Sequence, residues 1–180
     1  MPARKVSPAA VPPPAALDKH TISVLVENRP GVLARVSGLF ARRGFNIDSL
    51  AVCATEDPEV SRMTVVTRGD ERQLEQIVKQ LDKLIDVITI LDHTHDDLIE
   101  REIALVKVHA TVDSRSEIMQ LATVFRAEVN HISPREEVMI LEVTGDANKI
   151  DAFLETLNKF EIQELVRTGT IAMVRGARHT

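Results

Sequence analysis

The chain has 180 residues, a hydrophobic content of 44% and a formal net charge of −5 at neutral pH. A chain of this length can hold one sizeable core or two small ones. The acidic balance gives no electrostatic reason to expect a nucleic acid or an anionic membrane as partner, and no apolar run reaches the roughly 18 residues of a membrane span. Cys53 is the single cysteine, so no disulfide can form within the chain, and a cytoplasmic location is expected.

The N-terminal residues 1–18 are expected to form a flexible tail. They are rich in proline and alanine, carry Arg4 and Lys5, and lack the apolar block of a secretory signal. A short organellar transit peptide stays open as an alternative for such a basic start. Residues 177–180 are expected to form a second, short tail.

A strand followed by a helix is predicted at the start of the folded part. Residues 20–27 are β-branched and apolar, and the turn residues 28–31 interrupt them and suit the beginning of a helix. Gly44 is placed to cap the end of this helix. The helix shows an apolar face at helical spacing, made by Val32, Val36, Leu39 and Phe40.

The next segments complete a first unit. Residues 46–54 and 60–68 predict two strands of a hairpin, separated by turn residues. A second helix starts at Asp70, with Gln73 placed for a capping box, and residues 87–91 predict a closing strand. The order β-α-β-β-α-β predicts an α+β fold of the ferredoxin-like type, in which two helices cover one face of a four-stranded antiparallel sheet.

The chain then repeats this order. Phe125 corresponds to Phe40 at an offset of 85 residues, and the apolar stripe of the second helix recurs later in the chain. The repeat predicts two ferredoxin-like modules, at residues 19–92 and 101–176, joined by a polar linker at 93–100. Each module holds only a small core, so contacts between modules or between subunits are expected to contribute to stability.

The second module has its own signals. Ser114 and Glu117 form a capping-box pattern at the start of its first helix. Residues 162–167 and 170–174 predict its closing strands.

A search for catalytic or metal-binding constellations identifies no catalytic residue. His93 and His95, with the two aspartates that follow, could chelate zinc or nickel, but they lie in a polar connector without cysteine partners, so a solvated linker is the favoured interpretation. Cys53 lies in a predicted strand without an obvious basic neighbour, which favours buried packing over nucleophilic use. No phosphate-binding loop, dinucleotide fingerprint or nucleophile elbow occurs.

The turn from the first strand into the first helix is the candidate binding site. Backbone N–H groups at a helix N-terminus attract carboxylates, and Gly31 lets a small ligand approach the main chain closely. Asn28 could accept a hydrogen bond from the ligand's ammonium group, while Val32, Leu33 and Ile47 could line an apolar pocket. The alternative is an ordinary helix cap, because asparagine and proline are favoured there whether or not anything binds.

At these residues the sequence resembles the small subunits of acetolactate synthase, whose N-terminal part is an ACT domain. The resemblance extends over about residues 21–176. The N-terminal tail is extra, and residues 129–131 stand where the family leads one to expect a more apolar run. The motifs that carry it are residues 22–52, which include RPGVLARVSGLFARRGFNI, and the runs at 61–64, 74–77, 100–102 and 167–169.

The resemblance implies a non-catalytic regulatory subunit in valine, leucine and isoleucine biosynthesis. Such a subunit is expected to pair as a homodimer, to activate a large catalytic subunit that joins two pyruvates into acetolactate, and to confer feedback inhibition by a branched-chain amino acid. Thiamine diphosphate, Mg and FAD are expected on the catalytic subunit and no cofactor in this chain. The effector is expected between two copies, held by Asn28, Gly31, Val32 and Leu33 of one and by Asn46 and Ile47 of the other.

Other functions were weighed against this one. An RNA-binding module would need aromatic residues on its open sheet, and the chain has no Trp or Tyr. A free-standing ACT sensor that regulates another enzyme or a transcription factor stays open as the alternative, since fold alone does not fix function. Valine is the expected effector, but the choice among valine, leucine and isoleucine also stays open, because one methylene is worth only about 1–3 kcal/mol in an apolar pocket.

Overall fold

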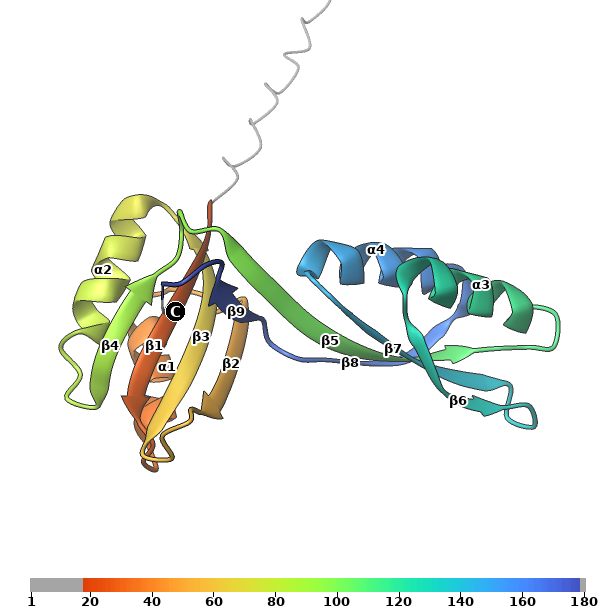
Figure 1. Cartoon of the computed structure of the whole chain (residues 1–180), viewed down its shortest axis with the longest axis horizontal. Helices are drawn as coiled ribbons and strands as arrows, with labels where there is room; N and C mark the ends of the chain where they lie inside the picture. The colour runs from red at the N-terminus through yellow and green to blue at the C-terminus, as the bar shows by residue number, and fades with distance from the viewer. Residues whose placement is uncertain (1–17, 179–180) are drawn as a thin grey trace, which may run out of the picture.

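The computed structural model of the chain describes residues 18–178. It is an α+β protein with two units joined by one long strand, β5 (Figure 1). Of the tail expected at residues 1–18, residues 1–17 lie outside the described part, and Asp18 is the first residue of β1. In chain order the elements are β1 (Asp18–Glu27), α1 (Val32–Arg42), β2 (Ser49–Ala54), β3 (Val60–Gly69), α2 (Glu71–Leu81), β4 (Val87–Asp92), β5 (Leu98–His109), α3 (Arg115–Phe125), β6 (Glu128–Ser133), β7 (Val138–Gly145), α4 (Ala147–Leu157), a 3-10 turn (Asn158–Phe160), β8 (Ile162–Arg167) and β9 (Ile171–Val174).

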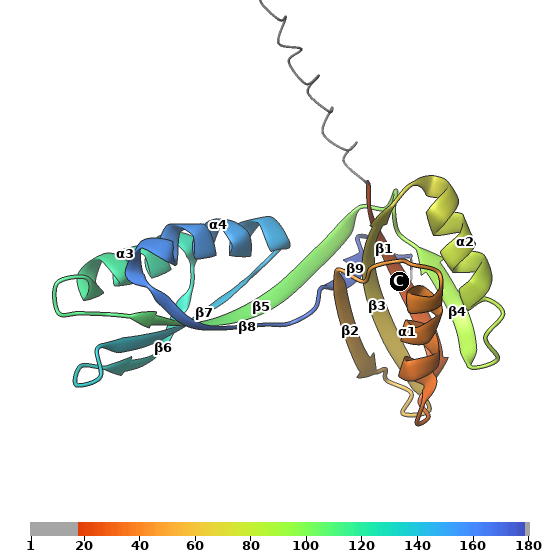
Figure 2. The same cartoon turned by 180° about the vertical axis from the view of Figure 1, so that it is seen from behind.

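Both units have the predicted topology. The first sheet has the strand order β2-β3-β1-β4 and the second has β6-β7-β5-β8, with every neighbouring pair antiparallel. In each unit two helices cover one face of the sheet, as the view from behind shows for α1 and α2 (Figure 2). The prediction of two ferredoxin-like units is therefore confirmed.

Each unit has its own hydrophobic core between sheet and helices. In the first, the predicted stripe of α1 is buried against β1 and β3. In the second, α3 and α4 bury their apolar faces on β5 and β7, and the rings of Phe125 and Phe153 lie 5.1 Å apart. Among residues 18–178 no helix is long and apolar enough to cross a membrane.

Helix α1 begins and ends at glycines with left-handed backbone. Gly31 is its N-cap residue with φ of 88°, and Gly44 follows the C-cap with φ of 71°. The N–H of Phe45 donates to the carbonyl of Phe40 at 3.0 Å, and the N–H of Gly44 donates to that of Ala41 at 3.1 Å. This pair of bonds is a Schellman motif, so the predicted cap at Gly44 is confirmed.

The other helix starts differ in how they are capped. Asp70 and Gln73 form the predicted capping box of α2, with Gln73 N–H donating to Asp70 Oδ1 at 2.7 Å. Asp146 caps α4 in the same way. The capping box expected at Ser114 is wrong, because Ser114 already has helical φ and ψ of −83° and −19° and its hydroxyl contacts Thr111 instead.

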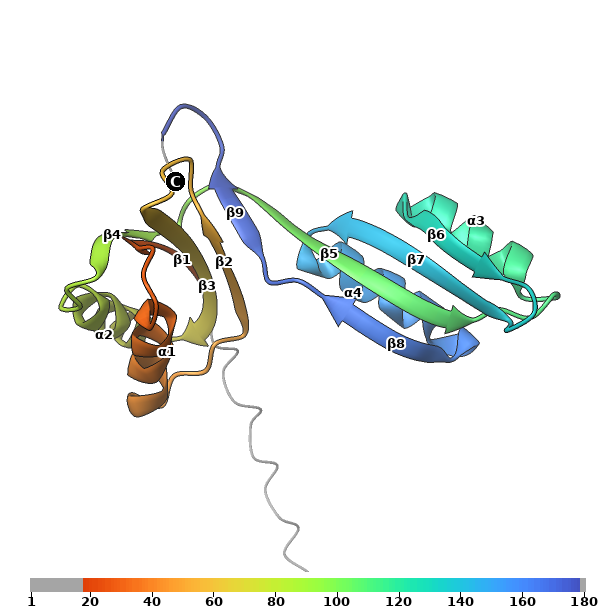
Figure 3. The same cartoon turned by 90° about the horizontal axis from the view of Figure 1, so that it is seen from below.

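Strand β5 crosses from one unit to the other, and its first residues differ from the expected linker. Residues 98–101 pair with β9, whereas Glu102 and the residues after it pair with β7. Part of the segment 93–100 is thus a strand. The segment 170–174, expected to close the second module, instead forms this ribbon beside the first sheet (Figure 3).

Two side chains lie elsewhere than expected. His93 is buried, its Nδ1 lies 2.9 Å from Asp96 Oδ2, and the part of the chain described shows no group of residues able to hold a metal. The solvated-linker interpretation is therefore wrong for His93, because its backbone N–H continues the pairing with Thr21 of β1. Cys53, expected to be buried, is exposed, because β2 is an edge strand.

The end of the described chain is attached to the loop before β5. The Arg175 N–H donates to the Asp97 carbonyl at 2.9 Å, and the Arg175 side chain donates to the carboxylate of the same residue at 2.9 Å. Arg178 forms an ion pair with Asp96. Hydrogen bonds from Arg178, and secondly from His93, hold the pKa of the Asp96 carboxyl below its ordinary value.

The capping difference gives a stability prediction. Asp70→Ala should lower the free energy of unfolding, measured by urea titration, by about 1 kcal/mol, because the N–H of Gln73 loses its acceptor. Ser114→Ala is the matched control and should cost clearly less, since that hydroxyl caps nothing. Equal losses in the two variants would contradict the assignment of the caps.

The Asp96 contacts give a pH prediction. Because the pKa of Asp96 is lowered in the folded state, its stabilising contribution is fully present above the ordinary carboxyl pKa of about 3.9 and is lost as the pH falls through the lowered value. The urea midpoint of wild type should exceed that of Asp96→Asn at pH 7, and the difference should shrink below pH 4. A difference that stays constant down to pH 3 would exclude this contribution.

Candidate functional site

The turn between β1 and α1 is held by hydrogen bonds to two neighbouring segments, the loop before β4 and the hairpin between β2 and β3. The N–H of Glu27 donates to the Asp86 carbonyl at 2.9 Å, and the N–H of Asn28 donates to the Glu59 carbonyl at 2.7 Å. The Asn28 side chain donates from Nδ2 to the Pro58 carbonyl at 2.8 Å. The amide of Asn28 is thus fixed with its nitrogen turned to the protein, which leaves its oxygen as an acceptor.

The N-terminus of α1 has no side-chain cap. Helical bonding begins with the N–H of Arg35 donating to the Gly31 carbonyl at 3.1 Å, so the N–H groups of Leu33 and Ala34 have no acceptor within the helix. The N-cap residue is Gly31, and a Cβ built on it would meet nothing within 4 Å. Unlike α2 and α4, this helix presents open donors beside open space.

Two arginines lie at the same place, each in an ion pair with a carboxylate. Arg35, in the first turn of α1, forms an ion pair with the nearly buried Asp86 at 2.8 Å. Arg29, in the turn itself, lies 3.2 Å from the carboxylate of Glu27. Because both arginines are already paired, the attraction for a carboxylate at this place comes from the N-terminus of the helix and its dipole.

The predicted site residues divide into two groups in the structure. Asn28, Gly31 and Leu33 are exposed around the turn. The side chain of Val32 is only 2% exposed and packs in the first core, so it holds α1 in place and does not line a pocket as expected.

Asn46 and Ile47 lie beyond the opposite end of α1. The strand expected at residues 46–54 begins only at Ser49. The residues before it contact β3 through isolated hydrogen bonds and not through a regular strand pairing. For example, the Asn46 carbonyl accepts from the Thr67 hydroxyl at 2.7 Å. A helix of 11 residues is about 16 Å long. One amino acid cannot bridge this distance within a single chain, so the two groups can share a ligand only if two copies supply them.

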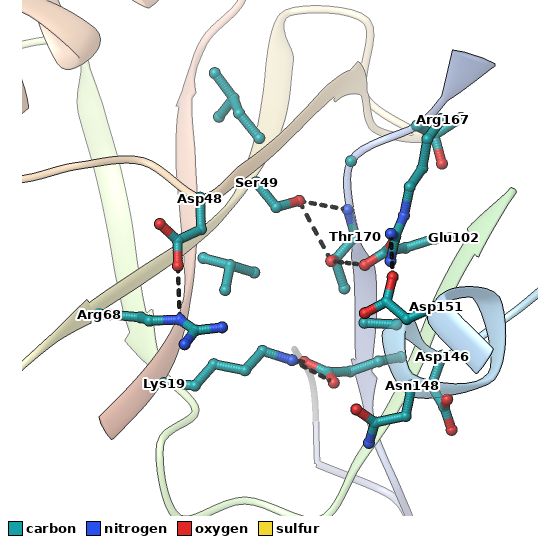
Figure 4. Close-up of a pocket in the computed structure, with 16 residues that line it drawn as sticks. Lys19, Asp48, Ser49, Arg68, Glu102, Asp146, Asn148, Asp151, Arg167 and Thr170 are labelled. Atoms are coloured by element: carbon teal, nitrogen blue, oxygen red, sulfur yellow. Dashed lines mark hydrogen bonds and ion pairs between the residues drawn. The ribbon is translucent and has the colours of Figure 1, made fainter. Parts of the chain in front are cut away.

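A hollow of the described chain lies elsewhere, between the two units. Its volume is about 680 Å³, and Figure 4 shows charged side chains from both units directed toward it. Lys19 donates to Glu100, and Arg68 donates to Asp48 at 2.9 Å. Because these charges are spent on one another, the hollow does not offer the vacant donors seen at α1.

A buried carboxylate stands at the joint beside this hollow. Glu102 is 6% exposed and accepts from the Arg167 Nε at 2.6 Å and from the Thr170 hydroxyl. Burial acts to lower the pKa of the Arg167 guanidinium, but hydrogen bonds to Asp151 and Glu102 outweigh it and raise that pKa, so the group stays charged. The runs that contain residues 102 and 167 are family-like in sequence, but no local pattern in either run predicts that the two side chains meet.

Comparisons with known proteins agree over both units. A family model described as an AHAS small subunit-like ACT domain matches residues 22–89, and one described as the small subunit of acetolactate synthase matches residues 101–176. A probable acetolactate synthase small subunit of Methanothermobacter thermautotrophicus is 54% identical over 162 residues, which are 89% of this chain and 95% of that protein.

Two further relatives support the same assignment. The acetolactate synthase small subunit of Mycobacterium leprae is 49% identical and covers 90% of this chain and 95% of its own length. The crystal structure of the small subunit from Thermotoga maritima superposes with a TM-score of 0.82 at 39% identity, covering 90% of this chain and all of that one. The chain therefore belongs to the family of acetolactate synthase small subunits, the regulatory subunits of that enzyme.

Proposed function

We propose that this chain binds a branched-chain amino acid, with valine the expected one, and thereby lowers the activity of the acetolactate synthase large catalytic subunit that it otherwise activates. The ligand carboxylate accepts from the N–H groups of Leu33 and Ala34, and its ammonium group donates to the Asn28 amide oxygen. The apolar side chain lies against Leu33 and, from the second copy, Ile47.

One observation carries this proposal: α1 starts at an uncapped glycine in open space. A structural cap would use the Asn28 side chain on the helix donors, but that side chain bonds Pro58 on the neighbouring hairpin. The backbone donors of Leu33 and Ala34 are therefore left for a ligand carboxylate.

A second copy completes the site in this proposal. Strand β2 is an edge of the first sheet and has the sequence SLAVCA, without a charged side chain that would discourage pairing. Pairing of β2 with its counterpart about a twofold axis covers this edge. It also provides each α1 turn with residues 46 and 47 from the other chain.

The regulatory effect is a linkage in this account. The small subunit has two arrangements, one of which supports less activity. An amino acid that binds this arrangement more tightly shifts the complex toward it. A coupling free energy of about 1–3 kcal/mol changes the equilibrium between the two arrangements 5- to 150-fold. Thiamine diphosphate, Mg and FAD belong to the catalytic subunit, which performs the chemistry. A free-standing ACT sensor is disfavoured, because the likeness to small subunits extends over both units.

The effector site is tested by Gly31→Asp. In the complex reconstituted with the catalytic subunit, this variant should lose inhibition by valine while it still activates. The added carboxylate repels that of the ligand by about 1 kcal/mol in water and about 4 at a partly screened surface when the two are about 4 Å apart. Acetolactate formation across a valine titration measures the effect.

The control is Gly176→Asp. Gly176 also has positive φ, 104°, with open space around it, so this variant carries the same charge and comparable backbone strain at a residue outside the proposed site. It should remain as sensitive as wild type. A folded Gly31→Asp protein with unchanged valine sensitivity would move the effector site elsewhere.

The homodimer is tested by Val52→Lys. Val52 lies on β2 and is 41% exposed, and a twofold axis through this edge would bring the two new lysines together. Sedimentation at micromolar concentration should show twice the chain mass of 20.0 kDa for wild type and a monomer for the variant. Ile88→Lys, on the opposite edge strand β4, should stay dimeric, and a monomeric wild type would refute the pairing.

A further inference from the structure

A hydrogen-bonded bridge connects the strand after the effector loop with the second unit. Ser49 is the first residue of β2, two positions after Ile47. Its Oγ accepts from the Thr170 N–H at 2.7 Å and donates to the Thr170 hydroxyl at 3.3 Å. The Thr170 hydroxyl in turn donates to Glu102 of β5.

The bridge continues into the second unit. The other carboxylate oxygen of Glu102 accepts from Arg167, the last residue of β8, and Arg167 also donates to Asp151 of α4. Figure 4 shows these side chains in one row along the side of the hollow. The row therefore joins β2, the β8–β9 connection, β5 and α4 without a gap.

Close backbone packing fixes the bridge in position. A Cβ on Gly169 would lie 2.3 Å from the carbonyl oxygen of Leu50 and 2.9 Å from the nitrogen of Ala51. No side chain fits there, so the main chain at residue 169 rests directly on β2. Thr168 is tied to the second unit, since its N–H donates to the Ile103 carbonyl at 3.0 Å and its hydroxyl accepts from the Ile103 N–H at 3.0 Å.

Burial makes the bridge sensitive to movement. Glu102 and Thr170 are 6% and 3% exposed, so a displacement of β2 that separates Ser49 from Thr170 would leave polar groups without partners and without water. Such groups are costly to leave unpaired. A shift of the loop at residues 46–48 must therefore either be resisted by the bridge or carry the segment 168–170 with it.

We propose that the Ser49–Thr170–Glu102 bridge is the positioning element that transmits effector binding from the loop at residues 46–47 to the second unit. This inference rests on the proposed function, because it assumes an effector at that loop. Ser49 and Thr170 touch no ligand in this account. They act by moving the β8–β9 connection, and with it Arg167 and α4, when the loop moves.

The test separates binding from transmission. Ser49→Ala and Thr170→Val each remove one hydroxyl of the bridge, and Asn148→Ala changes an exposed side chain at the same hollow that is not part of it. For each full-length protein, calorimetry gives the dissociation constant for L-valine. The reconstituted complex gives the ratio of activities without and with saturating valine.

We expect wild type and Asn148→Ala to bind valine and to show inhibition within the usual 5- to 150-fold coupling range. In Ser49→Ala and Thr170→Val, the dissociation constant for valine should stay within about threefold of the wild-type value. The ratio of activities without and with saturating valine, however, should fall toward 1 in both variants. The double variant should lose no more than either single one, because residues in one network are not additive. Using two variants keeps the test decisive if one of them fails to fold.

Amide hydrogen exchange supplies a readout that a merely structural role would not change. In wild type, valine should slow exchange both at residues 46–54 and at 162–170, whereas in the bridge variants the second effect should vanish. Bridge variants that bind and are inhibited like wild type would overturn the inference. A wild type that neither binds valine nor is inhibited by it would instead overturn the proposed function, so the two failures are distinguishable.

Discussion

The buried carboxylate of Glu102 is the interaction on which the arrangement of the two units depends. Each unit has a small core of its own, and among the described residues strand β5, the short strand β9, the close packing of Gly169 on β2 and the side chains around this carboxylate connect the two. A buried charge is tolerated only when it is fully bonded, and here Arg167 and Thr170 supply those bonds. Thr170 also bonds Ser49 of β2 in the first unit, and Arg167 also bonds Asp151 of α4 in the second, so side chains of both units meet around Glu102.

The turn proposed to bind the effector is connected to this joint through α1 and the loop that leads into β2. Helix α1 carries the first half of the proposed site at its N-terminus, and the loop after its C-terminus carries the second half directly before β2. In the proposed dimer, a ligand that bridges two copies would contact the loop just before β2, whose first residue, Ser49, bonds the joint. Local contacts of this kind allow a small ligand to bias two packed arrangements of the units without unfolding either one.

The sequence was sufficient to predict the features that depend on residues close together in the chain, namely the order of the elements and two of the helix caps. Alternation and helical spacing predicted both β-α-β-β-α-β units, and Gly44, Asp70 and Gln73 carry caps that depend on a few neighbouring residues. The absence of a cap at Ser114 could not be predicted, because a serine side chain caps a helix only with an extended backbone, and that depends on how the preceding turn packs. Glu102 and Arg167 are 65 residues apart in the chain, and no local sequence pattern around either residue indicates that they form a contact.

The central claim is that this chain regulates a catalytic subunit and has no activity of its own. It is tested most directly by measuring acetolactate formation from pyruvate with the chain alone, with the catalytic subunit alone, and with both, each without and with valine. The account predicts no product from the chain, a higher rate from the mixture than from the catalytic subunit alone, and loss of that increase with valine. Product formed by the chain alone, or a mixture whose rate responds neither to the chain nor to valine, would contradict it.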